Sequence, residues 1–246
     1  MKDYITIIGG GLAGSEAAYQ IAKKGIKVKL YEMKPNNFSP AHSDKNLAEI
    51  VCSNSLKSNL HTNACGLLKE ELRLLDSLLI RIADEVAVPA GQALAVDREK
   101  FALRVTEELE KMENVEIIRK EIDTELEQML QEGIVIIATG PLTSDKFSVE
   151  IAKLTGQDKL YFYDAAAPII EKETINMDIA FWGNRYEQER EKDEEVTDWK
   201  ERISKQEKSG YINLPMNEQE YNEFVEALIN AEVVTLHDFE KREIFE

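Results

Sequence analysis

The chain has few of the residues from which metal centres and disulfide frameworks are built. Its 246 residues include two cysteines and three histidines. Cys52 and Cys65 stand thirteen residues apart, which does not fit a CxxC redox pair, and two thiols alone cannot form a four-cysteine zinc site. We therefore expect no metal site, and the isolated thiols favour a reducing compartment, the cytoplasm.

Long apolar runs and an excess of positive charge are also lacking. The first apolar run, Tyr4 to Ile8, is too short for a signal peptide, and no stretch approaches the roughly 18 to 20 residues that cross a bilayer. Thirty basic residues face 47 acidic ones, a net charge of -17, which argues against nonspecific binding to nucleic acid. An RNA partner would need a confined basic patch, for which Lys34, Lys45 and Lys57 are candidates. The sequence specifies no oligomeric state.

A strand, a glycine turn, a helix and a second strand fill the first 32 residues. The β-branched run Tyr4 to Ile8 leads into Gly9, a small-residue helical pattern extends to Gly25, and Lys27 to Tyr31 resumes a strand that stops at Glu32. This order predicts a complete βαβ unit.

The glycine turn has the GxGxxG spacing of dinucleotide-binding folds. In that motif Gly9 permits the tight turn, Gly11 lets a pyrophosphate approach the backbone, and Gly14 lets helix and strand pack closely. Glu32 follows Gly14 by eighteen residues, where an acidic side chain can bind the ribose hydroxyls and disfavour a 2′-phosphate. A glycine turn without a ligand is the alternative, but the strand before and the helix after favour a cofactor. The expected contacts in the turn are Gly9, Gly10, Gly11, Leu12, Ala13 and Gly14.

A later strand favours FAD over NAD. The wholly apolar run Ile134 to Ala138 ends at Thr139 and Gly140, about 130 residues after the glycine turn. This arrangement resembles the glutathione-reductase-like flavoproteins, in which such a strand returns beside the cofactor. We therefore expect an α/β fold with a Rossmann-like FAD-binding core over residues 1–150, Thr139 and Gly140 at the cofactor, and an α+β inserted region over residues 151–246.

Other elements follow from hydrophobic spacing. Asn63 to Ala83 predicts one amphipathic helix with a buried leucine face, and Asp97 is placed to cap the next helix. The run Ile134 to Ala138 is typical of a strand buried on both faces. Further expected elements are a helix over 145–154, a strand over 160–163, a charged helix or flexible insert over 187–208, and a last helix over 221–231.

Six strings in order are more specific than any one motif. They are GGGLAGSEAA at 9–18, CSNSLKS at 52–58, HTNACGLLKEELR at 61–73, PAGQALAVDR at 89–98, ATGPLTS at 138–144 and LYFYDAAAPI at 160–169. Together they resemble the folate- and FAD-dependent tRNA (uracil-5-)-methyltransferase family, TrmFO. The resemblance runs over essentially the whole chain, and family members continue for almost as long again, so we expect the N-terminal portion of the family length.

The resemblance implies a flavoprotein that passes a methylene group from methylenetetrahydrofolate to C5 of a T-loop uridine in tRNA, with NAD(P)H supplying electrons. Uracil C5 is a poor nucleophile until a thiolate adds to C6, so the reaction class needs a reactive cysteine. Cys52 matches the family's position, against the alternative of an inert buried thiol. Cys65 is assigned to packing, and Asp97 with Arg98 resembles a family pair near the active centre.

One string departs from the family. Where the family has asparagine, cysteine, proline and methionine, this chain has Asn213, Leu214, Pro215 and Met216. A leucine cannot add to uracil, so Cys52 acts alone, or the chain is a paralogue that methylates ribosomal RNA, or it does not methylate. A non-catalytic FAD-binding fragment and an NAD(P)H–flavin oxidoreductase are the alternatives from other functional classes.

Overall fold

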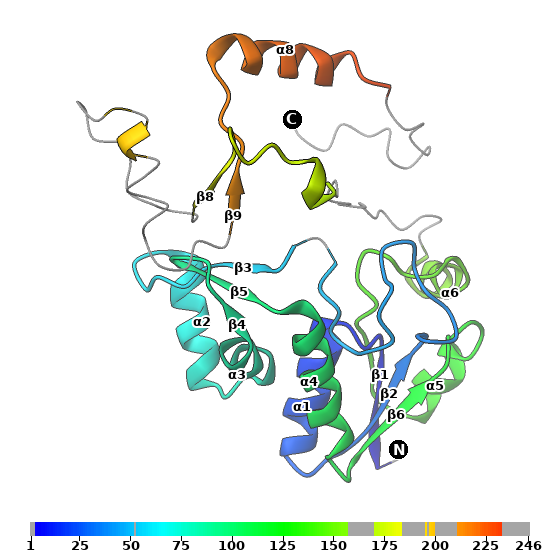
Figure 1. The fold of residues 1–246 in the computed structure, drawn as a ribbon. Helices are drawn as coiled ribbons and strands as arrows, with labels where there is room; N and C mark the ends of the chain where they lie inside the picture. The colour runs from blue at the N-terminus through cyan, green and yellow to red at the C-terminus, as the bar shows by residue number, and fades with distance from the viewer. Residues whose placement is uncertain are drawn as a thin grey trace. The chain divides into compact units, whose positions relative to one another are not determined.

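The computed structural model describes residues 3–51, 53–156, 170–183, 195, 197–199 and 211–232. The chain divides into two compact units, Met1–Val88 with Ala93–Ala167 and Pro89–Gln92 with Pro168–Glu246. The first unit contains the glycine turn and the elements around it (Figure 1).

A parallel four-stranded sheet forms the centre of the first unit. Its strands are β1 (Tyr4–Ile8), β2 (Lys27–Glu32), β6 (Val115–Arg119) and β7 (Val135–Ile137), in the order β6-β2-β1-β7. The helix α1 (Leu12–Lys23) connects β1 to β2, which confirms the βαβ unit. In a parallel sheet all carboxyl ends lie at one edge, so the glycine turn and Glu32 are brought together there.

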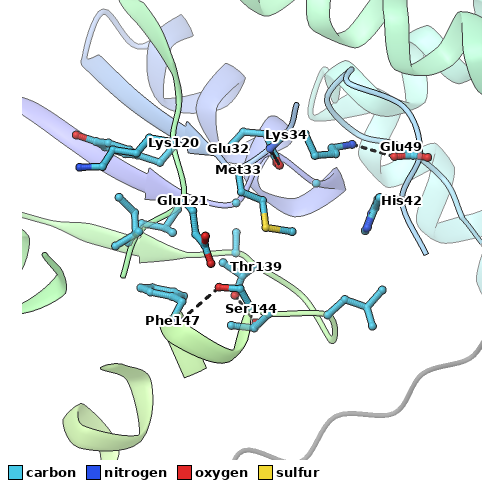
Figure 2. A pocket seen from close by; sticks show the side chains of 18 residues that line it. Glu32, Met33, Lys34, His42, Glu49, Lys120, Glu121, Thr139, Ser144 and Phe147 are labelled. Carbon is cyan, nitrogen blue, oxygen red and sulfur yellow. Dashed lines mark hydrogen bonds and ion pairs between the residues drawn. The ribbon is translucent and has the colours of Figure 1, made fainter. Parts of the chain in front are cut away.

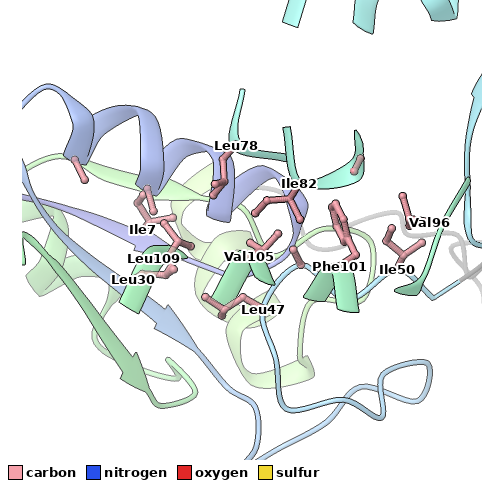
Figure 3. Close-up of a cluster of buried hydrophobic side chains, with 14 of the residues drawn as sticks. Ile7, Leu30, Leu47, Ile50, Leu78, Ile82, Val96, Phe101, Val105 and Leu109 are labelled. Carbon is pink, nitrogen blue, oxygen red and sulfur yellow. The ribbon is translucent and has the colours of Figure 1, made fainter. Parts of the chain in front are cut away.

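Side chains alternate between the two faces of this sheet. Ile7, Val28 and Leu30 face a core shared with α1 and α4 (Arg98–Glu110), which lie side by side (Figure 1). Figure 3 shows Leu30 and Ile7 in that cluster beside Val105 and Leu109 of α4. On the other face, Ile8 packs in a smaller cluster with residues of α5 (Leu126–Glu132) and α6 (Asp145–Thr155). Helices on both faces of a parallel sheet confirm the α/β class.

The single helix expected over 63–83 is wrong, because two helices occupy this stretch. They are α2 (Ala64–Leu74) and α3 (Leu78–Glu85). Asp76 between them has a left-handed backbone, with φ of 55°, and Ser77 caps α3 by accepting from the Ile80 N–H. The leucines of the expected face are therefore not buried together. Leu67 and Leu68 are about half exposed and Leu75 is 70% exposed, whereas Leu78 and Ile82 of α3 are fully buried.

The expected burial of the later strand on both faces is also wrong. β7 lies at the edge of the described sheet, paired with β1 alone, and Ile137 is 37% exposed. A long connection between β2 and β3 (Ser55–Ser58) is held by buried Leu47 and Ile50. Antiparallel strands β3, β5 (Ala93–Val96) and β4 (Ala87–Val88) form a second small sheet.

The described part of the second unit contains a strand pair and a helix. β8 (Phe181–Gly183) pairs antiparallel with β9 (Tyr211–Asn213), after a 3₁₀ turn η1 (Lys172–Thr174). Asn217 and Glu220 form a capping box that begins α8 (Glu218–Ile229), the expected last helix. The strand expected over 160–163 lies outside the described residues, as does nearly all of 187–208. Across the described helices, none is long and apolar enough to span a membrane.

Candidate cofactor-binding site

A pocket of about 660 Å³, part of it open to solvent, lies at the carboxyl edge of the parallel sheet (Figure 2). Its walls come from the glycine turn, the end of β2, the connection after β2, the end of β6 and the segment from β7 into α6. The lining residues are Ile8, Gly9, Gly11, Tyr31, Glu32, Met33, Lys34, His42, Glu49, Lys120, Glu121, Ile122, Ala138, Thr139, Leu142, Thr143, Ser144 and Phe147.

Two glycines of the turn are required by packing within the protein. Gly9 has a left-handed backbone, with φ of +103°, and a Cβ there would lie 2.5 Å from the carbonyl oxygen of Ala138. A Cβ at Gly14 would lie 1.8 Å from the carbonyl oxygen of Gly9. Side chains at these positions would therefore push β1 away from β7 and from α1.

Gly11 has a different environment. Among the described residues, no atom lies within 4 Å of the position that a Cβ at Gly11 would occupy, although Gly11 lines the pocket. Protein packing therefore gives no reason for a glycine there, and a ligand that approaches the backbone does.

The N-terminus of α1 also has features that suit an anion. Side chains cap α2, α3, α4, α6 and α8, whereas α1 and α5 begin without a side-chain cap. Unlike α5, α1 also has no acidic residue in its first turn. The first N–H groups of a helix have no partner within it, and the helix dipole adds positive potential. A pyrophosphate would satisfy both.

Glu32 forms a fixed acceptor beside this anion site. Its side chain is buried, with Oε2 accepting from the Gly10 N–H at 2.8 Å and Oε1 from the Lys34 N–H at 3.0 Å. A carboxylate has about four acceptor positions, so capacity remains for hydroxyl donors such as those of a ribose. Gly10 makes room for this arrangement, because a Cβ there would lie 2.8 Å from Glu32 Oε2.

The opposite wall combines hydroxyls with apolar side chains. The hydroxyls of Thr139 and Thr143 are 2.6 Å apart, and Thr143 also donates to the Gly140 carbonyl at 2.9 Å. Ile122 and Phe147 add apolar surface from the end of β6 and from α6. Such a wall suits a flat, weakly polar ring system.

A third wall was not foreseen from the sequence. The Lys34 ammonium lies 2.9 Å from Glu49 Oε2 and donates to the Asn46 carbonyl at 2.7 Å, with only 5% of the Lys34 side chain exposed. His42 joins this pair, and its Nδ1 lies 2.5 Å from Ser39 Oγ. Figure 2 shows Lys34, Glu49 and His42 together on one side of the pocket. The proline-rich connection carried no pattern that could have indicated this grouping.

Burial and neighbouring charges set the protonation of this wall. Burial lowers the pKa of His42 below its usual value, and the Lys34 cation lowers it further. Burial alone would raise the pKa of Glu49, but hydrogen bonds from the Ser43 and Asp44 N–H groups and from Lys34 outweigh it and lower the pKa. The wall therefore carries a neutral imidazole and a closed ion pair at neutral pH.

The structure brings four of the expected cofactor contacts around the pocket, Gly9, Gly11, Glu32 and Thr139. The other five are adjacent in sequence without lining it: Gly10, Leu12, Ala13, Gly14 and Gly140. Cys52, the expected nucleophile, lies outside the described residues.

Several other residues have roles that the structure assigns. Asp97 caps α4 by accepting from the Lys100 N–H at 3.2 Å, while Arg98 reaches the Ile50 carbonyl at 3.5 Å. Lys34 is wrong as an RNA-contact candidate because it is buried, whereas Lys45 and Lys57 are exposed. Within the described ranges, no group of three or more histidine, cysteine, aspartate or glutamate side chains could hold a metal ion.

These walls fit the adenosine diphosphate part of FAD. The α1 N-terminus suits the pyrophosphate, Glu32 suits the ribose hydroxyls, and the apolar side of the pocket suits a base.

Comparisons with known proteins find relatives that match nearly the whole length of this chain. The methylenetetrahydrofolate--tRNA-(uracil-5-)-methyltransferase TrmFO of Bacillus pumilus is 50% identical over 246 residues, which are 100% of this chain and 51% of that protein. The protein of the same name from Bacillus mycoides is 51% identical over 242 residues, which are 98% of this chain and 50% of that protein. The chain thus spans about half the length of the curated relatives it matches.

A solved structure of Aquifex aeolicus GidA aligns with a TM-score of 0.39 at 19% identity, over 49% of this chain and 20% of that one, which is too limited a superposition to carry an argument. The family model of the glucose inhibited division protein A matches residues 4–246. Because this match extends over nearly the entire sequence, the chain belongs to the glucose inhibited division protein A family.

Proposed function

We propose that the protein performs folate-dependent methyl transfer to C5 of a T-loop uridine in tRNA, with FAD bound in the pocket of the first unit. The observation that carries this proposal is the identity of about 50%, over the full chain, to relatives named as methylenetetrahydrofolate-dependent tRNA (uracil-5-)-methyltransferases. NAD(P)H is the proposed reductant. A cytoplasmic location belongs to the same proposal, since tRNA and free thiols both occur in a reducing compartment.

The proposed cofactor contacts are Gly9, Gly10, Gly11, Leu12, Ala13, Gly14, Glu32, Thr139 and Gly140. Supporting them are the open space at Gly11, the uncapped start of α1 and the buried Glu32 carboxylate. Bound FAD would supply the chemistry that carries a one-carbon unit from the folate. Residues 1–150 form the proposed cofactor core, and residues 151–246 the proposed substrate region.

Cys52 is the proposed nucleophile for uracil C6. Leu214, in the position of the family's second cysteine, directly follows β9 and is 55% exposed, so a hydrocarbon side chain stands where a thiol is expected. The protein's own covalent step therefore depends on Cys52.

The first test is reconstitution followed by a methylation assay. The purified chain, after incubation with FAD, should show a bound flavin spectrum and should methylate a tRNA transcript only when methylenetetrahydrofolate and NAD(P)H are both present. A transcript with cytidine in place of the T-loop uridine is the control, and a ribosomal RNA fragment tests the paralogue. Bound flavin without any folate-dependent methylation would reject the transferase proposal.

Substitution of Cys52 provides a second test with a matched control. Cys52→Ala should lower methyl transfer by at least about 10³-fold, because the covalent activation of uracil would be lost. Cys65→Ala should keep most of the activity, since Cys65 stands in the first turn of α2 and is assigned to packing. Full activity of Cys52→Ala would overturn the role of Cys52.

The second candidate is a flavoprotein without transferase activity, which Leu214 favours. Such a protein would bind FAD and, as an NAD(P)H–flavin oxidoreductase, would oxidise NAD(P)H with oxygen alone. Oxygen uptake that is independent of folate and RNA distinguishes it from the leading proposal.

A further inference from the structure

A free positive charge near Glu32 would let the site accept an adenosine ribose that carries a 2′-phosphate. In dinucleotide folds an acidic residue after the second strand binds the 2′-hydroxyl, and a nearby basic residue accommodates a 2′-phosphate. Lys34 is placed for the second task, because its backbone N–H donates to Glu32 Oε1 at 3.0 Å and it lines the same pocket. The question is whether its ammonium is free to bind a phosphate.

The Lys34 ammonium is engaged by two other groups. It lies 2.9 Å from Glu49 Oε2 and 2.7 Å from the Asn46 carbonyl, and the two side chains are only 5% and 11% exposed. Figure 2 shows the pair joined at one side of the pocket. A buried ion pair is costly to break, because a separated charge would be left without solvent or partner.

The other basic side chains nearby are uncharged, outside the pocket lining, or ion-paired. His42 is uncharged at neutral pH, since burial and the Lys34 cation lower its pKa by more than the Glu49 and Glu32 carboxylates raise it. Arg119 does not line the pocket, and its guanidinium donates to the carbonyls of Lys34 and Lys45. Lys120 pairs with Glu125.

We infer that Glu49 is a specificity-determining residue: by holding the Lys34 ammonium in a buried ion pair, it makes the site accept an unphosphorylated adenosine ribose and reject a 2′-phosphate. This inference rests on the proposed dinucleotide function of the pocket. The pocket lining contains three carboxylates, those of Glu32, Glu49 and Glu121, and two ammonium groups, so its own charge opposes an added phosphate. A phosphorylated dinucleotide such as NADPH would then have to deliver electrons from another position.

The test compares ADP-ribose with 2′-phospho-ADP-ribose, which differ only in the 2′-phosphate, by calorimetric titration of the full chain. The wild-type chain should bind ADP-ribose at least about tenfold more tightly than its phosphorylated analogue. Glu49→Gln keeps an acceptor oxygen for the Ser43 and Asp44 N–H groups but frees the Lys34 ammonium. It should shift the affinity ratio toward the phosphorylated ligand by about tenfold.

Two further variants make the result specific to Lys34. Adding Lys34→Gln to Glu49→Gln should abolish the shift. Lys34→Gln alone should not move the ratio toward the phosphorylated ligand, because the Glu49 carboxylate left without its partner would repel a phosphate. Glu110→Gln is the matched control: it removes an exposed carboxylate of α4 that does not line the pocket, and it should not shift the ratio.

The outcomes separate this inference from the cofactor proposal. Binding of ADP-ribose with no preference over the phosphorylated ligand, or an unchanged ratio in Glu49→Gln, overturns the role of Glu49 while the dinucleotide site stands. A ratio that moves toward the phosphorylated ligand in Lys34→Gln alone also overturns it, and this variant covers the case in which Glu49→Gln does not fold. A wild-type chain that binds neither FAD nor ADP-ribose rejects both proposals.

Discussion

The glycines of the first turn have different surroundings, although the motif presents them as one group. Gly9 and Gly14 lie against backbone atoms of the strands, where an added Cβ would come within 2.5 Å and 1.8 Å of a carbonyl oxygen. A Cβ at Gly11, which lines the pocket, would meet no atom of the described residues within 4 Å. The fold therefore requires glycine at positions 9 and 14, whereas the proposed cofactor is the reason for glycine at position 11.

A pair of alanine substitutions separates the two requirements. Gly14→Ala should destabilise the chain by about 3 kcal/mol, because α1 must move away from β1 to admit the methyl group. Gly11→Ala should change the stability by less than about 1 kcal/mol, since its φ of -69° suits alanine and the space is open. It should nevertheless weaken FAD binding by at least about tenfold, because the methyl group would stand where the pyrophosphate approaches.

The measurements are urea unfolding without cofactor and fluorescence titration with FAD. A Gly11→Ala chain that loses stability but binds FAD normally would contradict this division of roles.

Among the helices, α1 and α3 are linked by the carboxylate of Glu16, which binds groups more than 60 residues away in the sequence. Glu16 of α1 accepts from Ser77 Oγ at 2.9 Å and from the backbone N–H groups of Leu78 at 3.2 Å and Leu79 at 3.0 Å. A side chain from another helix thus serves as part of the N-terminal cap of α3.

Removal of this carboxylate should loosen α3. Glu16→Ala should lower the free energy of unfolding by about 1–3 kcal/mol, because the N–H groups of α3 would lose their partner. Glu16→Gln should cost less, since its amide oxygen can still accept. The control is Glu110→Ala, an exposed position on α4 whose carboxylate has no partner within the described part of the chain, with an expected change within about 0.5 kcal/mol.

Denaturant unfolding gives the energies, and hydrogen exchange at Leu78 and Leu79 localises the effect. Equal losses of unfolding free energy in Glu16→Ala and Glu110→Ala would argue against a capping role of Glu16 at α3.

The same region shows why local periodicity misjudged these helices. The leucine spacing through Leu67 and Leu75 continues without interruption, so the pattern favoured one helix over 63–83. Asp76 and Ser77 interrupt it with a left-handed residue followed by a cap, both of which use short polar side chains. The break is stable because Glu16, distant in sequence, meets the new helix end.

For the whole chain, the free energy of unfolding should begin to fall at a pH higher than that at which the carboxylates take up protons. Burial, aided by the Lys34 cation, holds the pKa of His42 below its ordinary 6.5. The unfolded chain then takes up a proton that the folded chain does not, so stability is fully present above pH 6.5 and is lost as the pH falls from 6.5 toward the lowered pKa. Glu49, whose pKa is also lowered, acts in a more acidic window below its ordinary 4.5.

His42→Gln should therefore flatten the pH dependence of stability just below pH 6.5. His61→Gln is the control, because the His61 side chain is 69% exposed. Thermal unfolding at a series of pH values measures both. An unchanged slope in His42→Gln would show that His42 titrates alike in the folded and unfolded chain.

Taken by itself, the sequence determined the βαβ unit, the dinucleotide class of the turn, the cap at Asp97 and the likeness to a methyltransferase family. The first three depend on neighbours within a few residues, where propensity, period and turn chemistry act directly, whereas the likeness rests on six strings spread along the chain. Only the tertiary structure decided which leucines are buried, that β7 is an edge strand, and that Lys34, His42 and Glu49 form a wall of the pocket. The physical reason is that burial and ion pairing depend on which distant segments meet, as where the Leu47 N–H meets the Thr106 hydroxyl at 2.8 Å, and no local pattern encodes such a meeting.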